Sequence, residues 1–181
     1  MQFKRRVVLC LAFLLFPALL SANDAISTNV EYKIKAGYLY NFTKFITWPE
    51  ENVPTFNLCI LGNDPFGDLI NPIEKRSVQG RPIKLFRFNH SPKRDQRCHI
   101  LYINAPGNNV AALKNDLALL DSADTLTVGE GGEFAKQGGM VGFVSREDKI
   151  KIQINLKAFK QSGLTVSAKL LEVAEIIGGT P

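Results

Sequence analysis

The sequence predicts an α/β fold: a three-layer sandwich on a mixed, mostly parallel sheet that includes an antiparallel C-terminal hairpin. Short apolar runs that end in turn residues alternate with segments of helical periodicity, which is typical of a parallel sheet with helices on both faces. Two later apolar runs, residues 140–144 and 150–154, flank a charged stretch and predict the hairpin. A long amphipathic segment, residues 31–49, precedes the first strand and supplies a helix that covers one face.

Residues 1–22 have the features of a secretory signal peptide. The basic residues 4–6 precede an apolar run, residues 7–20, which is shorter than the ~20 residues that a transmembrane helix needs. We therefore expect cleavage after Ala22 and a single exported domain, residues 23–181. Cleavage removes three of the 22 basic residues and none of the 17 acidic ones. The remaining net charge of about +2 gives no electrostatic support for nucleic-acid binding.

Residues 31–49 predict one helix with the largest aromatic surface in the chain. Thr28 and Glu31 have the spacing of a capping box, and the Trp48-Pro49 pair ends the helical pattern. Lys35 falls within the apolar arc, so we expect the first turn to protrude. Apolar side chains recur at helical spacing on the face expected to cover the sheet: Val30, Ile34, Tyr38, Leu39, Phe42, Phe45 and Ile46.

The remaining elements follow from apolar spacing and turn signals. We expect parallel strands at residues 56–61, 83–88, 98–103 and 125–128. We expect helices at residues 66–74, shortened or kinked by Pro72, and at residues 110–120, 156–161 and 167–177, and a short helix or turn at residues 131–137. This order of strands and helices favours a doubly wound sheet, in which the first strand lies between the second and the third.

The cysteines predict a disulfide. Cys10 lies in the expected signal peptide, which leaves Cys59 and Cys98 in a chain sent to an oxidising compartment. The alternative is that both thiols are buried and do not form a disulfide. In the doubly wound order, the strand that carries Cys59 lies beside the strand that begins at Cys98. The topology and the disulfide therefore support each other.

The carboxyl ends of parallel strands are where open α/β sheets bind ligands. Three loops of this sequence would lie there, and their glycines allow close approach of a ligand. The candidate ligand-binding residues are Asp64, Phe66, Asn104 and Glu130. The alternative is that these loops are simply turns. The glycines after Glu130 lack the lysine and hydroxyl residue of a phosphate-binding loop.

The sequence offers no catalytic or metal-binding pattern, so we predict that the protein is not an enzyme and holds no cofactor or metal. A disulfide would consume both thiols, and the serine motif of hydrolases is missing. His90 and His99 lack serine and acid companions and do not have the spacing of zinc ligands. His99, beside Cys98 on a strand, is typical of a structural residue.

The aromatic residues of the first helix have two interpretations. They pack in the core, or some of them form an exposed patch that binds another protein. The last predicted helix would likewise either pack or form half of a groove beside the first helix. The candidate partner-binding residues are Tyr32, Tyr40, Trp48, Lys169 and Leu171.

Several stretches of the sequence together resemble one family. They are YKIKAGYLYNFTKFITWP at residues 32–49, CILGNDPF at 59–66, LTVG at 126–129, the glycine pair 138–139 with INL at 154–156, and GLTVSAKLL at 163–171. Together they cover nearly all of the expected exported chain. The sequence resembles the YfiR family, and Cys59 and Cys98 match the disulfide positions of that family.

The resemblance implies a periplasmic α/β protein that represses an inner-membrane diguanylate cyclase. Such a protein binds the periplasmic sensory region of the cyclase and thereby lowers cyclic di-GMP and biofilm formation. The resemblance also implies a homodimer, and an OmpA-like outer-membrane lipoprotein that sequesters the repressor. The alternative is a periplasmic small-ligand receptor that uses Asp64, Asn104 and Glu130 at the strand ends.

Overall fold

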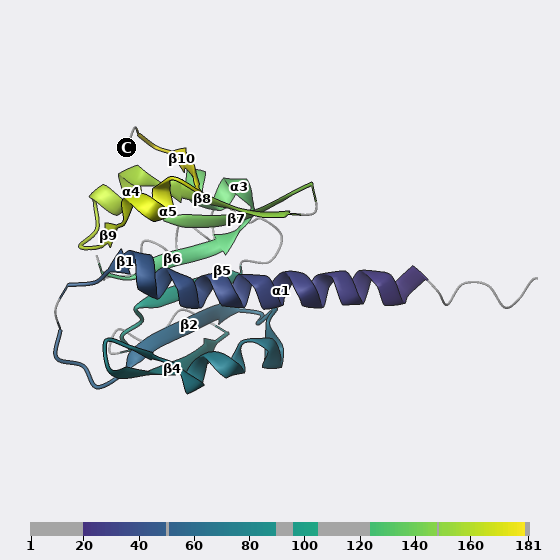
Figure 1. The fold of residues 1–181 in the computed structure, drawn as a ribbon, viewed down its shortest axis with the longest axis horizontal. Coiled ribbons are helices and arrows are strands. Elements are labelled where there is room, and N and C mark those ends of the chain that lie inside the picture. Colours follow the sequence, from purple (N-terminus) through teal and green to yellow (C-terminus); the bar gives the residue numbers. More distant parts are fainter. Residues whose placement is uncertain (1–19, 50, 90–95, 105–123, 148, 180–181) are drawn as a thin grey trace, which may run out of the picture.

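The computed structural model describes residues 20–49, 51–89, 96–104, 124–147 and 149–179 of the 181 residues (Figure 1). The helices are α1 (Leu20–Phe45), η1 (Gly67–Leu69), η2 (Asn71–Lys75), α3 (Gly131–Lys136), α4 (Leu156–Lys160) and α5 (Ala168–Leu171). The strands are β1 (Ile46–Thr47), β2 (Phe56–Gly62), β3 (Ser77–Val78), β4 (Arg81–Phe88), β5 (Ile100–Asn104), β6 (Leu126–Glu130), β7 (Val141–Arg146), β8 (Lys149–Asn155), β9 (Thr165–Val166) and β10 (Glu175–Ile177). The expectations for most of the signal peptide, Cys10, His90 and residues 110–120 lie outside the described residues.

Eight strands form one mixed sheet in the order β10-β8-β7-β6-β5-β2-β4-β3 (Figure 1). The pairs β4–β2, β2–β5, β5–β6 and β6–β7 are parallel, and β7–β8 is an antiparallel hairpin. Strand β2 lies between β4 and β5, as the doubly wound order requires. The predicted fold class is confirmed. Strands β1 and β9 form a separate antiparallel pair.

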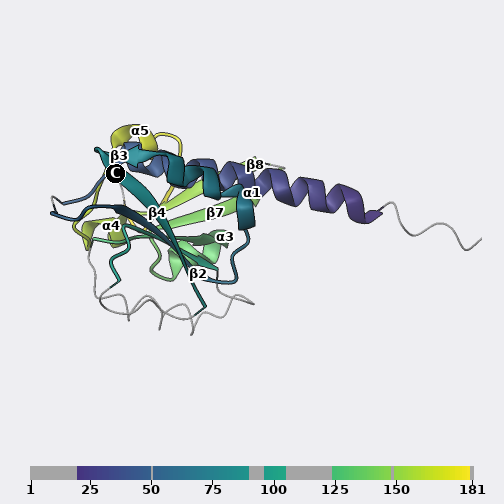
Figure 2. The same cartoon turned by 90° about the horizontal axis from the view of Figure 1, so that it is seen from below.

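Helix α1 covers one face of the sheet, and α3 covers the other (Figure 2). Successive residues of a strand point to opposite faces, and β2 shows the consequence. Leu58 packs in the apolar cluster that contains Leu39 and Phe42 of α1. Its neighbour Cys59 packs in the cluster that contains Phe134 of α3. The fold therefore has three layers, as the sequence predicts.

The predicted disulfide is present in the structure. Cys59 on β2 and Cys98, just before β5, are joined with a Cα–Cα distance of 5.8 Å. Both residues are buried in the cluster on the α3 side of the sheet. The bond therefore ties the central strand to its parallel neighbour.

The predicted start of the first helix is wrong. Helix α1 spans Leu20–Phe45, so Thr28 lies inside the helix and does not cap it. Val30 and Ile34, which we expected to be buried, are 53% and 47% exposed, whereas Lys35 is buried. A helix of 26 residues is about 39 Å long and exceeds the strands beneath it, so its N-terminal part extends past the sheet (Figure 1). No helix in the described part of the chain is long and apolar enough to cross a membrane.

The prediction of a helix over residues 167–177 is wrong in its second half. Helix α5 ends at Leu171, and β10 pairs in parallel with β8. Ile176 and Ile177 are β-branched and gain partners at the edge of the sheet, so strand pairing prevails over helical spacing. The helix expected at residues 66–74 is divided into η1 and η2, with its proline in the first turn of η2.

Candidate partner-binding site

Helix α1 runs antiparallel to the parallel strands. Past its C-terminal end, the Trp48 indole Nε1 donates to the carbonyl oxygen of His99 (3.0 Å), just before β5 begins. Nearer the N-terminus, Lys35 Nζ lies 2.6 Å from Glu130 Oε2 at the carboxyl end of β6. The middle of α1, around Lys35, therefore lies at the carboxyl edge of the sheet, where open α/β folds bind ligands.

An ion cluster around Lys35 fixes α1 at this edge. The Lys35 side chain is 1% exposed, and its Nζ lies 2.5 Å from Glu31 Oε1 as well as 2.6 Å from Glu130 Oε2. Tyr102 on β5 donates its hydroxyl to the other oxygen of Glu130. The ammonium group also lies 4.6 Å from the ring centre of Tyr32. Two carboxylates and an aromatic face thus replace the water that burial removes from this lysine.

Three groups of the cluster have shifted pKa values. Burial acts to lower the pKa of Lys35, but the bonds with Glu130 and Glu31 outweigh it, and the pKa is raised. Burial acts to raise the pKa of Glu31, but the bond and charge of Lys35 outweigh it, and the pKa is lowered. Burial and then the Glu130 carboxylate raise the pKa of Tyr102, which stays protonated as a donor. These directions keep Lys35 and Glu31 charged and Tyr102 protonated, as a structural clamp requires.

A groove of about 760 Å³ runs between residues 30–38 in the middle of α1 and the β7–β8 hairpin. The hairpin and the N-terminal part of α1 extend on the same side of the molecule (Figure 1). Ser145 on β7 donates to Glu31 of α1 (3.1 Å) and ties the two walls together. The groove is lined by Val30, Glu31, Ile34 and Tyr38 of α1, and by Ser145, Arg146, Glu147, Lys149, Ile150 and Lys151 of the hairpin.

A second polar cluster surrounds His99 near the amino ends of the strands. The His99 side chain is 0% exposed, and its Nδ1 accepts from the backbone N–H of Asn57 (2.9 Å). The proton of the neutral imidazole is therefore on Nε2, which lies 2.6 Å from Glu51 Oε1. The other oxygen of Glu51 lies 2.8 Å from Arg97 Nη2. Burial lowers the pKa of His99. The Glu51 carboxylate acts to raise this pKa, whereas the positive charges of Arg81 and Arg97 act to lower it further.

A model of the YfiR/HmsC-like family matches residues 32–175, from α1 to the first residue of β10. The chain belongs to the YfiR/HmsC-like family. The resemblance indicated by the sequence motifs is thus confirmed. No curated protein matches the sequence. Membership of the YfiR/HmsC-like family suggests a periplasmic regulator of diguanylate cyclase signalling and not an enzyme.

In this YfiR/HmsC-like fold, the four predicted ligand-binding residues are all bonded within the protein. Asp64 Oδ2 pairs with Arg87 Nε (2.6 Å), while Asp64 Oδ1 accepts from the backbone N–H of Phe66 (2.7 Å). The Phe66 ring is buried in the core. Asn104 donates to a backbone carbonyl of the β2 loop (2.6 Å), and Glu130 holds α1. These contacts fix the loops, and ligand binding by these residues stays a prediction.

The five predicted partner-binding residues lie in different environments. Trp48 is 8% exposed and belongs to the core, so its ring offers little surface to a partner. Tyr32 and Tyr40 are half-buried on α1. Lys169 is exposed and Leu171 is half-buried on α5. The structure thus leaves four of the five with accessible surface, and their role in binding stays a prediction.

The groove and the two polar clusters were not predicted from the sequence. The only signal was a lysine inside an apolar arc, which requires either protrusion or a carboxylate partner. Nothing in the sequence indicates that Glu130 is that partner. Within the described residues, no group of three His, Cys, Asp or Glu side chains is placed to hold a metal ion.

Proposed function

We propose that this protein is a periplasmic repressor of an inner-membrane diguanylate cyclase. It binds the periplasmic sensor region of the cyclase, holds the enzyme in a state of low activity, and thereby lowers cyclic di-GMP and biofilm formation. The observation that carries this proposal is the match to the YfiR/HmsC-like family over residues 32–175. From the resemblance we also propose that the repressor forms a homodimer. We further propose that an OmpA-like lipoprotein sequesters it away from the cyclase.

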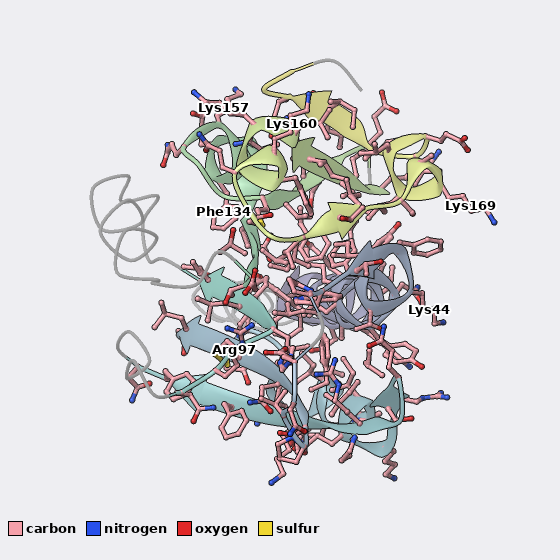
Figure 3. All side chains as sticks on the ribbon, turned by 90° about the vertical axis from the view of Figure 1, so that its left-hand side faces the viewer. Lys44, Arg97, Phe134, Lys157, Lys160 and Lys169 are labelled. Atoms are coloured by element: carbon pink, nitrogen blue, oxygen red, sulfur yellow. A yellow bond between two sulfur atoms is a disulfide. The ribbon has the colours of Figure 1, made fainter. Side chains whose placement is uncertain are left out.

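The contact surface that we propose is formed by the C-terminal half of α1 and by α5. These elements are neighbours because β1 pairs with β9, and the backbone N–H of Ser167 donates to Phe45 O (2.8 Å). Tyr40 and Leu171 are half-buried there. Figure 3 shows Lys44 of α1 and Lys169 of α5 on the same side of the molecule.

The surface combines aromatic, aliphatic and basic groups. Lys44 Nζ lies 4.7 Å from the ring centre of Tyr40, and Arg76 Cζ lies 5.7 Å from it. Val173, just after α5, is 71% exposed. Aromatic anchors with a polar and basic rim are typical of protein interfaces. This composition supports a protein partner with acidic groups around an apolar centre.

Repression requires only a difference in affinity. The repressor binds one conformation of the cyclase sensor more tightly than the other, and the population of cyclase shifts toward that conformation. Shifting the inactive fraction from 1% to 99% requires about a 10⁴-fold difference in affinity. Removal of the repressor then restores the active conformation.

The experiment that tests the function is deletion of the gene in its host, with measurement of intracellular cyclic di-GMP. We expect cyclic di-GMP to rise, and the full chain to restore the low level. A version that lacks residues 1–22 should not restore it, because it stays in the cytoplasm. Complementation by this version would contradict a periplasmic role, and an unchanged cyclic di-GMP level in cells that contain active cyclase would contradict repression.

The surface is tested by Tyr40→Glu and Leu171→Glu. We expect each variant to fold normally and to lose binding to the sensor region of the cyclase by about tenfold or more, because a carboxylate would enter the apolar centre of the contact. Lys84→Glu, at an exposed position of β4, is the control for a change of surface charge. Undiminished binding by both substituted variants would exclude this surface.

A further inference from the structure

Part of strand β8 forms an open edge of the sheet. Strand β10 pairs only with residues Gln153 to Asn155 of β8. On the edge away from β7, residues 149–152 of β8 have no strand partner in the part of the chain that the structure describes. An unpaired edge presents backbone donors and acceptors that another strand can use.

The backbone of Ile150 faces this edge. The β7–β8 pairing is regular from Arg146↔Lys149 to Val141↔Ile154. The N–H of Asn155 donates to Met140 O (2.9 Å), so Asn155 directs its backbone groups toward β7. Because this direction alternates along an antiparallel strand, the N–H and C=O of Ile150 point away from β7. They are available to an added strand.

The groove beside α1 lies next to this edge. Ile150 points to the α1 side of the sheet, where it packs on the apolar core. Val30 and Ile34 of α1, 53% and 47% exposed, form the facing apolar wall. Lys149 and Lys151 also border the groove, but they alternate with Ile150, so their side chains project toward the other face of the strand.

The charges on the edge favour an acidic occupant. Arg146 pairs with Glu175 (3.4 Å), whereas Lys149 and Lys151 form no ion pair with a described residue. Two copies of this edge paired antiparallel would bring these lysines together, which disfavours a second copy of the chain. A segment with carboxylates at alternate positions would instead complement them.

We propose that the groove between α1 and β8 binds an extended segment of a partner protein, in which apolar and acidic residues alternate. The segment adds as a strand to the open edge of β8 at Ile150. Its apolar side chains lie against Ile34, Tyr38 and Ile150, and its carboxylates meet Lys149 and Lys151. Backbone hydrogen bonds supply affinity and the alternating side chains supply specificity, as in other cases of strand addition. This site uses the middle of α1, whereas the surface formed with α5 uses its C-terminal end, and the proposal goes beyond the proposed function.

The probe is a fluorescein-labelled peptide of alternating valine and glutamate, about nine residues long, the length of a long strand. Its binding to the full exported protein, purified from the periplasm, is measured by fluorescence anisotropy. We expect micromolar binding. A peptide of the same composition with contiguous valines, and one of alternating valine and lysine, should bind at least tenfold more weakly.

Two variants test the mode of binding. Ile150→Pro removes the outward N–H without removing a β7–β8 hydrogen bond, and Ile150→Ala shortens the same side chain but keeps the N–H. We expect Ile150→Pro to abolish peptide binding and Ile150→Ala to weaken it only several-fold. In wild-type protein, bound peptide should slow hydrogen exchange of the Ile150 amide. This measurement does not depend on whether a variant folds.

The charge requirement is tested by reversal. Lys149→Glu combined with Lys151→Glu should weaken peptide binding by about tenfold or more. Lys157→Glu combined with Lys160→Glu, on α4, is the matched control and should leave binding unchanged (Figure 3).

Each of these results would overturn the proposal: no binding of the alternating peptide, equal binding of the contiguous one, equal binding by Ile150→Pro and Ile150→Ala, or equal loss in both charge-reversal variants. Displacement of bound peptide as the protein dimerises would assign the edge to a second copy instead.

Discussion

Replacing Lys35 by methionine tests whether the ion cluster holds α1 on the sheet. Methionine keeps most of the buried aliphatic stem but removes the ammonium group. Loss of one partner of a buried ion pair costs about 3–5 kcal/mol. The Glu31 and Glu130 side chains are 35% and 30% exposed, so water can reach them once the ammonium is gone. We therefore expect a smaller loss, about 2–3 kcal/mol, or a decrease in melting temperature of roughly 5–10 °C.

The double variant Lys35→Met/Glu130→Gln separates charge from packing. Glutamine at position 130 still accepts a hydrogen bond from the hydroxyl of Tyr102 and removes one of the two carboxylates left unpaired, so we expect about 1 kcal/mol of the lost stability to return. Lys33→Met, at an exposed position of the same helix, is the control and should change stability by less than about 0.5 kcal/mol.

The assay is urea unfolding of the oxidised protein, in which a change of midpoint at constant slope reports stability alone. If Lys35→Met unfolded at the same urea concentration as Lys33→Met, the cluster would not stabilise the helix. A double variant less stable than Lys35→Met would show that the cost does not come from the unpaired Glu130 carboxylate.

Three further predictions concern the disulfide, a buried histidine and a glycine. Reduction of the Cys59–Cys98 bond should lower the free energy of unfolding by about 4 kcal/mol, as measured by urea unfolding with and without reductant. The pKa of His99 is lowered in the folded protein, so the contribution of His99 to stability is complete above about pH 6.5 and is lost as the pH falls toward the lowered pKa. In thermal melts, the melting temperature of His99→Asn should therefore fall less than that of wild type between pH 7 and pH 5. Gly62→Ala should lower the free energy of unfolding by about 2–4 kcal/mol, because the φ of Gly62 is +90° and a Cβ would lie 2.4 Å from a backbone oxygen. In the same unfolding assay, the control Gly67→Ala should cost about 1 kcal/mol, because its Cβ would meet no atom within 4 Å.

The central part of the fold could be predicted because local patterns determine it. Apolar runs bounded by turn residues located β2, β4, β5 and β6, and the usual order of such sheets placed β2 between β4 and β5. That order brought Cys59 close to Cys98. The disulfide followed from the same step.

The short strands could not be predicted in this way. Strands β1, β3 and β9 have two residues each, and β10 has three, which is too short for a period of two to be visible. They form because a neighbouring element offers unpaired backbone groups. Residues 175–177 have helical spacing after α5, yet they pair with β8 because the sheet edge is available.

Lys35 shows why the candidate site was only partly predictable. Its position in an apolar arc indicates that it must either protrude or find a carboxylate, but Glu130 lies 95 residues away in sequence. Only the fold brings the two together. The same cluster also shapes the groove, because Glu31 contacts both Lys35 and Ser145 of the hairpin. A change at Lys35 is therefore expected to loosen the groove wall, and peptide binding at β8 should weaken together with stability in Lys35→Met but not in Lys33→Met.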